Sequence, residues 1–248
     1  MLIISLLEGQ ETSSGRFFVI LKIMSAIVGV NNSNYLAYRK AFPEGRYNGA
    51  YYYAKEVEEN IIPLVKTDRN WDCLGMMVTQ HYDHSIIFLH HNLNFANTYK
   101  WINKYKDVIL VASSWATYAA AQDAGHRVIY LPLSVDVSYV KQFRTKKTKG
   151  ACYAGNRWKF KDADLARHVP DGVEFPPANL PREELLKFIA PYRECYCIGR
   201  CAIEAKILGC EVKVCDSRYP DPGYWEIVDN KNAAKILQEE LDKIDNSK

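Results

Sequence analysis

The sequence predicts an α/β protein with two Rossmann-like domains that face each other across a cleft. Short apolar runs, typical of strands buried on both faces of a parallel sheet, alternate with helical segments along most of the 248 residues. A basic, polar stretch at 141–149 has no apolar periodicity, as expected of an interdomain linker. With 48% hydrophobic and 25% charged residues, the composition excludes collagen-like, coiled-coil and disordered chains.

The first domain is assigned to residues 24–140. Met24 opens an apolar run that leads into a polar loop, as the first strand of an α/β domain does. Residues 1–23 are then either an N-terminal extension or an additional pair of strands, and both readings stay open. The further predicted strands are 85–91, 107–113 and 126–132. A helix at 115–123 begins after Ser114 or Ser113 and ends at Gly125.

The second domain is assigned to residues 150–248. A helix over 182–189 is entered from Pro181, and another over 199–208 ends at Gly209. An amphipathic helix at 233–244 closes the chain and could cross back to the first domain. The remaining predicted elements are the strands 150–155, 173–175, 195–198 and 211–215 and a short helix at 162–168.

Charge, cysteine content and hydropathy limit the functional classes. The net charge of +3 gives no global attraction to nucleic acid, so such a partner would need a local basic patch. Seven cysteines without regular spacing or a Cys-x-x-Cys knuckle indicate buried thiols in a reducing compartment rather than disulfides or zinc. No apolar stretch is long enough for a membrane span. We therefore expect a cytoplasmic protein without a signal peptide.

Two segments of the second domain are candidate anion sites. Eight Lys or Arg and no acidic residue lie between 141 and 161, and Arg157 and Lys161 follow a predicted strand. Their cations are suited to a phosphate group. The first turn of the helix that begins at Gly199-Arg200-Cys201 offers backbone N–H groups and the positive end of its dipole.

Three further side chains are candidates near these segments. Glu204, one turn into the helix, could accept hydrogen bonds from ribose hydroxyls, or it could merely complement the helix dipole. His90 and His91 end a predicted strand and are candidates for acceptor contact or proton transfer.

In combination, these segments resemble GT-B glycosyltransferases of the retaining, nucleotide-sugar-dependent type. Gly199-Arg200 with Glu204, Gly209 and Val212 is similar to the family's donor-binding segment. Tyr153-Ala-Gly-Asn-Arg157 with Lys161 is similar to its diphosphate-binding strand and loop. The segment 107–114 and the following 125–136 look like its strand, helix and strand that end in a Pro-Asn-Gly-Val-Asp element. The matches occur in the family's order over residues 85–215.

The resemblance implies transfer of a sugar from a nucleoside diphosphate sugar to an acceptor, without a metal or other cofactor. The acceptor could be a glycan, a small molecule or a modified nucleic acid. Arg157, Lys161 and the 199–201 turn would bind the diphosphate, and Glu204 the ribose. Tyr196 stands where the family usually has a Glu near the sugar, which makes Tyr196 a candidate sugar contact. Two alternatives stay open: a catalytically silent nucleotide-sugar-binding module, and a transferase that acts on modified DNA bases through the basic segment 141–161.

Overall fold

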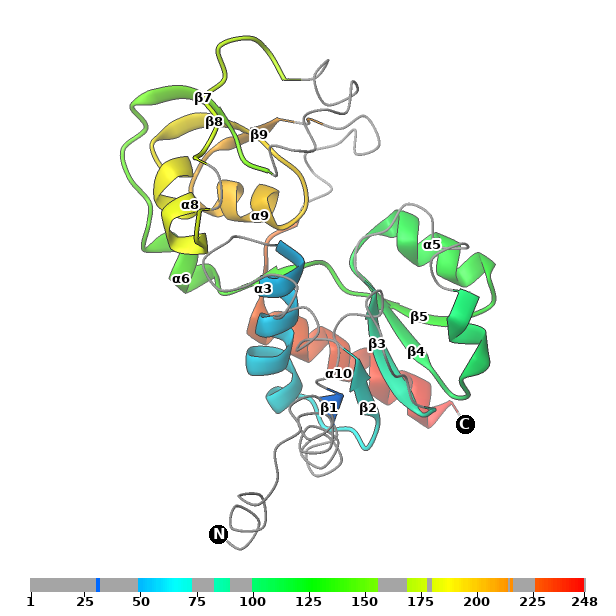
Figure 1. Ribbon diagram of the computed structural model, residues 1–248. Helices are drawn as coiled ribbons and strands as arrows, with labels where there is room; N and C mark the ends of the chain where they lie inside the picture. The colour runs from blue at the N-terminus through cyan, green and yellow to red at the C-terminus, as the bar shows by residue number, and fades with distance from the viewer. Residues whose placement is uncertain are drawn as a thin grey trace, which may run out of the picture.

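The computed structural model is an α/β protein in which parallel strands alternate with helices (Figure 1). This confirms the predicted fold class at that level. The structure describes residues 30–31, 49–72, 83–89, 100–155, 169–177, 180–213, 215 and 226–247. The predicted extension 1–23, most of the predicted strand that begins at Met24, and the predicted helix 162–168 lie outside these ranges. None of the described helices is both long and apolar enough to cross a membrane.

A five-stranded parallel sheet forms the first unit. Its strands are β1 (Val30–Asn31), β2 (Asn70–Asp72), β3 (Ser85–Leu89), β4 (Ile109–Ala112) and β5 (Arg127–Tyr130). They are neighbours in chain order, and every pairing is parallel. Every residue of β3 and β4 is buried, as the continuous apolar runs predicted. Rossmann folds bind ligands where the strand order reverses, and the described strands contain no such reversal.

Helices cover both faces of this sheet. Helix α5 (Trp115–Asp123) packs on one face, where Ala121 joins a cluster with β3 and β4 residues. Ser114 is its N-cap, and the Ser114 side chain accepts a hydrogen bond from the Thr117 N–H. On the other face lie α3 (Gly49–Glu56), the π-helical turn η1 (Val57–Ile61) and the 3-10 turn η2 (Ile62–Leu64). A further 3-10 turn, η3 (Lys100–Lys104), precedes β4.

The last segment of the chain returns to this first unit. Strand β10 (Val228–Asp229) pairs in parallel with β6 (Ser134–Val135), and α10 (Asn230–Asn246) then packs along η1 and η2 (Figure 1). Near the end of α10, Asp245 Oδ1 accepts a hydrogen bond from the buried Arg69 at 3.1 Å. The C-terminal helix therefore completes the core of the unit in which the described chain begins.

A three-stranded parallel sheet forms the second unit. The strands of this sheet are β7 (Lys149–Tyr153), β8 (Tyr192–Tyr196) and β9 (Glu211–Lys213). Helix α6 (Val137–Lys141) precedes β7 in the chain. Helices α8 (Arg182–Ile189) and α9 (Arg200–Ile207) connect the strands and match the predicted helices closely. The predicted strand 173–175 is reduced to one bridge between Glu174 and Cys152, and β8 begins three residues before the predicted Cys195.

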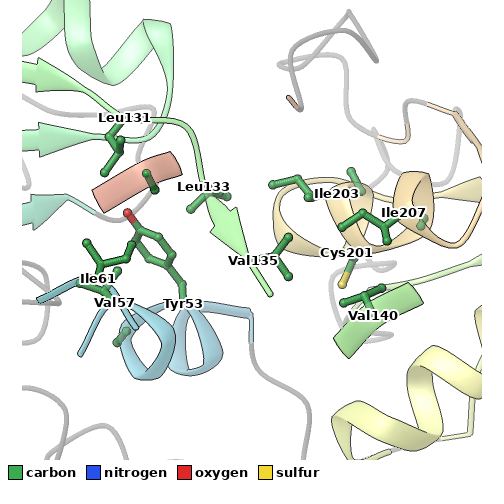
Figure 2. Packing of buried hydrophobic residues seen from close by; sticks show 14 of the residues in the cluster. Tyr53, Val57, Ile61, Leu131, Leu133, Val135, Val140, Cys201, Ile203 and Ile207 are labelled. Atoms are coloured by element: carbon green, nitrogen blue, oxygen red, sulfur yellow. The ribbon is translucent and has the colours of Figure 1, made fainter. Parts of the chain in front are cut away.

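One apolar core runs through both units. In Figure 2, Leu133 and Val135 lie between Tyr53 of α3 and Ile203 of α9. All belong to a single cluster of buried residues that extends from β3 and β4 to α8, α9 and β9. The chain from Leu131 to Val140 is therefore part of the hydrophobic core, whereas most residues of the predicted linker 141–149 are exposed.

Candidate functional site

The carboxyl ends of β7 and β8 bring two glycine-containing turns to one edge of the second sheet. Tyr153 pairs with Tyr196, and the next N–H, that of Ala154, donates to the Tyr196 carbonyl at 3.0 Å. Beyond this pair the chain leaves β7 at Gly155 and leaves β8 through Gly199 into α9. Because neighbouring parallel strands end at the same edge, residues that follow them can meet there.

Gly199 gives the second turn a backbone conformation that other residues rarely adopt. Its φ is 64° and its ψ is −139°, which brings the chain from β8 into the first turn of α9. A Cβ at this position would meet no atom within 4 Å, so the requirement is conformational rather than steric. The first turn of a helix offers backbone N–H groups that the helix itself cannot bond, together with the positive end of the helix dipole.

Four of the predicted site residues lie outside the described parts of the chain. They are His90, His91, Arg157 and Lys161. Described chain ends one residue before His90, at Leu89, and two residues before Arg157, at Gly155. The roles of these four side chains in acceptor and diphosphate binding stay predictions.

Glu204 belongs to a buried cluster of four charged side chains. Its Oε1 accepts a hydrogen bond from Arg182 Nε at 2.9 Å and another from Arg200 Nε at 3.0 Å. Both arginines also pair with Glu56 Oε1, and the distance from Arg182 is 2.9 Å. Two guanidinium and two carboxylate groups balance one another, as charges must when they are removed from water.

Glu56 connects this cluster to two other elements. Its Oε2 accepts hydrogen bonds from the Asp136 backbone N–H at 2.9 Å and from Asn230 Nδ2 at 3.1 Å. One carboxylate of α3 thereby contacts the start of α6 and the start of α10, besides the arginines of α8 and α9. No local pattern in the sequence indicates this role, because Glu56 and Arg200 are 144 positions apart.

Burial decides what Glu204 can contact in this structure. Its exposed fraction is 0%, so a ribose hydroxyl would reach the carboxylate only if Arg182 or Arg200 moved away. Arg200 and Cys201, predicted at the diphosphate site, are 4% and 7% exposed, which leaves their backbone N–H groups as the candidate contacts. The predicted ribose and diphosphate contacts remain untested.

Side chains around Arg182 and Asp136 complete the surroundings of the cluster. The Arg182 guanidinium lies over the rings of Tyr139, at 4.9 Å, and Tyr52, at 5.3 Å. Burial acts to raise the pKa of Asp136. Hydrogen bonds from Ser138 and from the Tyr139 N–H outweigh that effect, and the pKa is lowered overall.

Tyr196 lies on the face of β8 opposite Cys195. It packs with the cluster that contains Tyr153 and Val173, whereas Cys195 faces the main core with α9. Burial is the main cause of its raised pKa, followed by the charge of Glu194. Its predicted contact with a sugar is not tested by this placement.

The cysteines of the second unit are buried thiols. The residues Cys152, Cys195, Cys197, Cys201, Cys210 and Cys215 are buried, and none of them forms a disulfide. Burial raises the pKa of Cys197 to about 11. Such thiols are poor nucleophiles and poor metal ligands at neutral pH. No group of three or more His, Cys, Asp or Glu in the described part of the chain could hold a metal ion.

Several cations of the basic segment form contacts within the protein. Arg144 Nε donates to the Ile207 carbonyl at 2.5 Å, and Lys147 Nζ donates to the Ala190 carbonyl at 2.8 Å. Lys149 bonds Tyr192 at 3.0 Å and Glu174 at 3.3 Å. These contacts hold the segment against the second unit. They also leave fewer of its Lys and Arg side chains available to bind the phosphates of a nucleic acid.

Comparison with known proteins adds no relative: no protein-family model, no curated protein and no solved structure matches this chain.

Proposed function

We propose that this chain is a metal-independent, retaining glycosyltransferase of the GT-B type, which uses a nucleoside diphosphate sugar as donor. The observation that carries the proposal is the register of β7 and β8. It brings the turn at Gly155 to the same sheet edge as Gly199 and the first turn of α9. Arg157 follows Gly155 by two positions in the sequence, and in the proposal its cation serves this edge. Cations and helix N–H groups at one edge are suited to a diphosphate leaving group.

The chemistry requires charge stabilisation more than a special nucleophile. The bond between the anomeric carbon and the diphosphate oxygen breaks, and a new bond forms from that carbon to an acceptor oxygen. The acceptor proton passes to a base, for which a donor phosphate oxygen or one of His90 and His91 is available. Because negative charge grows on the departing diphosphate, Arg157, Lys161 and the α9 N-terminus would lower the barrier there.

The return of α10 to the first unit also supports a two-domain transferase. The crossing joins both units through β10 and α10, and Glu56 contacts both sides of the junction. In the proposed arrangement, the first unit, 24–140 together with the returning β10 and α10, receives the acceptor, and the second unit, from residue 150 to that return, binds the donor.

A nucleotide-binding screen tests the proposal. Nucleoside diphosphates and their sugars are added to the full chain, and the melting temperature is recorded. A ligand at a hundred times its Kd should stabilise the fold by about 2.7 kcal/mol. Arg157→Ala should remove the shift, whereas Lys146→Ala, which removes a charge elsewhere in the basic segment, should keep it. If no nucleotide shifts the wild-type chain, the proposal is wrong.

A second candidate is a catalytically silent module that binds the same donor. The specific observation in its favour is Tyr196, which stands where the family usually has a Glu near the sugar and which packs with the cluster of Tyr153 and Val173. Release of free nucleoside diphosphate in the presence of acceptors distinguishes the two candidates. Binding across several donors without any release favours the silent module.

A further inference from the structure

An exposed tryptophan lies on top of an aromatic stack at the carboxyl edge of the first sheet. Trp115 is the first residue of α5 and is 53% exposed. Its ring stacks on Tyr130, with centroids 4.0 Å apart and an interplanar angle of 19°. Tyr118 meets both rings edge to face, with centroids at 5.4 Å from Trp115 and 6.1 Å from Tyr130. We call these three side chains the aromatic platform.

The platform is held rigidly from below. Tyr118 packs against the buried cluster between α5 and the sheet. The turn that carries Trp115 is fixed by the Ser114 cap, whose side chain bonds both the Thr117 N–H and the Thr117 hydroxyl. A ring that is already oriented loses little conformational entropy when a ligand stacks on it.

The platform lies at the carboxyl edge of the first sheet. Ala112, the last residue of β4, pairs with Tyr130, the last residue of β5, so the platform begins where both strands end. Side chains that follow the ends of neighbouring parallel strands can meet a ligand at this edge, although the described strands contain no reversal of order, which is where Rossmann folds bind theirs. The large exposed apolar side chains of the described chain are Leu64, Trp115 and Ile227, and Trp115 alone among them is aromatic.

The charge around the platform indicates a neutral ligand. Residues 108–126, which contain β4 and α5, include no Lys or Arg, and Asp123 at the far end of α5 is their one acidic residue. A nucleic-acid strand needs cations along its phosphates as well as stacked rings. A saccharide ring needs only an aromatic face, because the C–H bonds on one side of the ring are apolar and meet the negative face of the indole.

We propose that the aromatic platform binds one ring of a neutral saccharide by stacking on Trp115. Saccharide binding at Trp115 is proposed independently of the transferase. The identification of this saccharide as the acceptor rests on the proposed function. The platform makes a modified DNA base a poorer acceptor, because the described segment 108–126, which carries Trp115 and Tyr118, has no Lys or Arg for a phosphate backbone.

Titration calorimetry with neutral oligosaccharides tests the proposal. The probes are oligomers of glucose, mannose, xylose and N-acetylglucosamine, added to the full chain without nucleotide. We expect at least one series to bind, with the Kd raised roughly tenfold or more in Trp115→Ala and less in Trp115→Phe. Leu64→Ala, which removes a similarly exposed apolar side chain on η2, serves as the matched control and should bind like the wild type.

Three results would overturn the platform: no series binds the wild-type chain, Trp115→Ala binds as tightly as the wild type, or single-stranded DNA binds in a Trp115-dependent manner in place of saccharide. The nucleotide screen is read separately. Trp115-dependent saccharide binding without any nucleotide shift contradicts the transferase and supports the platform. A nucleotide shift without saccharide binding contradicts the platform and supports the donor site.

Discussion

At the scale of single residues, the buried charged cluster around Glu204 makes the fold sensitive to the loss of any one of its members. Glu204 has no exposed surface, and two guanidinium groups share its Oε1. Glu56 supplies the second carboxylate from α3. Removing one member of such a group leaves uncompensated charge in the interior, which costs far more than the intact pair contributes.

Glu204→Gln should therefore destabilise the fold strongly. The side chain keeps its size but loses its charge, so Arg182 and Arg200 then share Glu56 alone. We expect the free energy of unfolding, measured by urea titration, to fall by roughly 3 kcal/mol. Glu183→Gln, in an exposed pair with Lys187, should leave the urea midpoint unchanged. Equal midpoints for both variants would show that the cluster is not maintained in solution.

The same residues mark the limit of prediction from sequence. Gly199 and Glu204 stand out in the sequence, since one opens a helix and the other is a carboxylate one turn into it, and their roles in donor binding stay predictions. Their partners could not be foreseen: Arg182 is 22 positions from Glu204, and Glu56 is 144 from Arg200. Pairing over such distances depends on how the units pack, and no local pattern carries that information.

At the scale of elements, the helices with a chemical start signal are predicted most closely, whereas α3 and α6 are not predicted. The bounds of α5 and α8 agree with the prediction, because Ser114 and Pro181 mark their starts chemically. Strand β8 begins at Tyr192, before the apolar run Cys195–Ile198 that predicts it. The apolar pattern misses this start, because the strand continues through the exposed Arg193 and the half-buried Glu194. The pairing of β6 with β10 joins two-residue segments far apart in the chain and leaves no periodicity to detect.

The stability of the turn into α9 depends on the absence of a side chain at Gly199. Gly199→Ala should lower the free energy of unfolding by roughly 1–3 kcal/mol, because its φ of 64° with ψ of −139° strains any side chain. It should also weaken nucleotide binding, since the first-turn N–H groups would change direction. Urea titration and the nucleotide screen measure the two effects.

Gly150→Ala is the matched control for this turn. Gly150 lies in β7, where an added Cβ meets nothing within 4 Å and the backbone is not in the left-handed region. This variant should keep both the stability and the nucleotide shift. A Gly199→Ala protein that behaves like Gly150→Ala would contradict the conformation assigned to the turn.

At the scale of the whole molecule, α10 ties the end of the chain to the first unit. Leu237 is fully buried against η1 and its neighbours, and Leu241 is 1% exposed. The Lys66 N–H donates to Gln238 at 2.6 Å, and Arg69 bonds Asp245. Because one apolar core runs through both units, damage at this contact should weaken the entire fold.

Leu237→Ala should lower the free energy of unfolding by roughly 2–5 kcal/mol, since it leaves a cavity beneath the helix. Lys235→Ala, two positions away with a side chain that is 76% exposed, should have no measurable effect. Tryptophan fluorescence and circular dichroism during urea titration should report one shared transition for both units. Two separate transitions would contradict a continuous core.

The return of α10 to the first unit also constrains the order in which the protein can fold during synthesis. The first unit has its sheet and α3 early in synthesis, yet the helix that covers η1 and the residue that pairs with Arg69 come from the last segment of the chain. On a ribosome, the side of η1 and η2 that α10 packs against stays uncovered until residues 230–246 have been synthesised. The first unit therefore completes its core only after the second unit has been made, and chaperones have the longest access to the surface that α10 will bury.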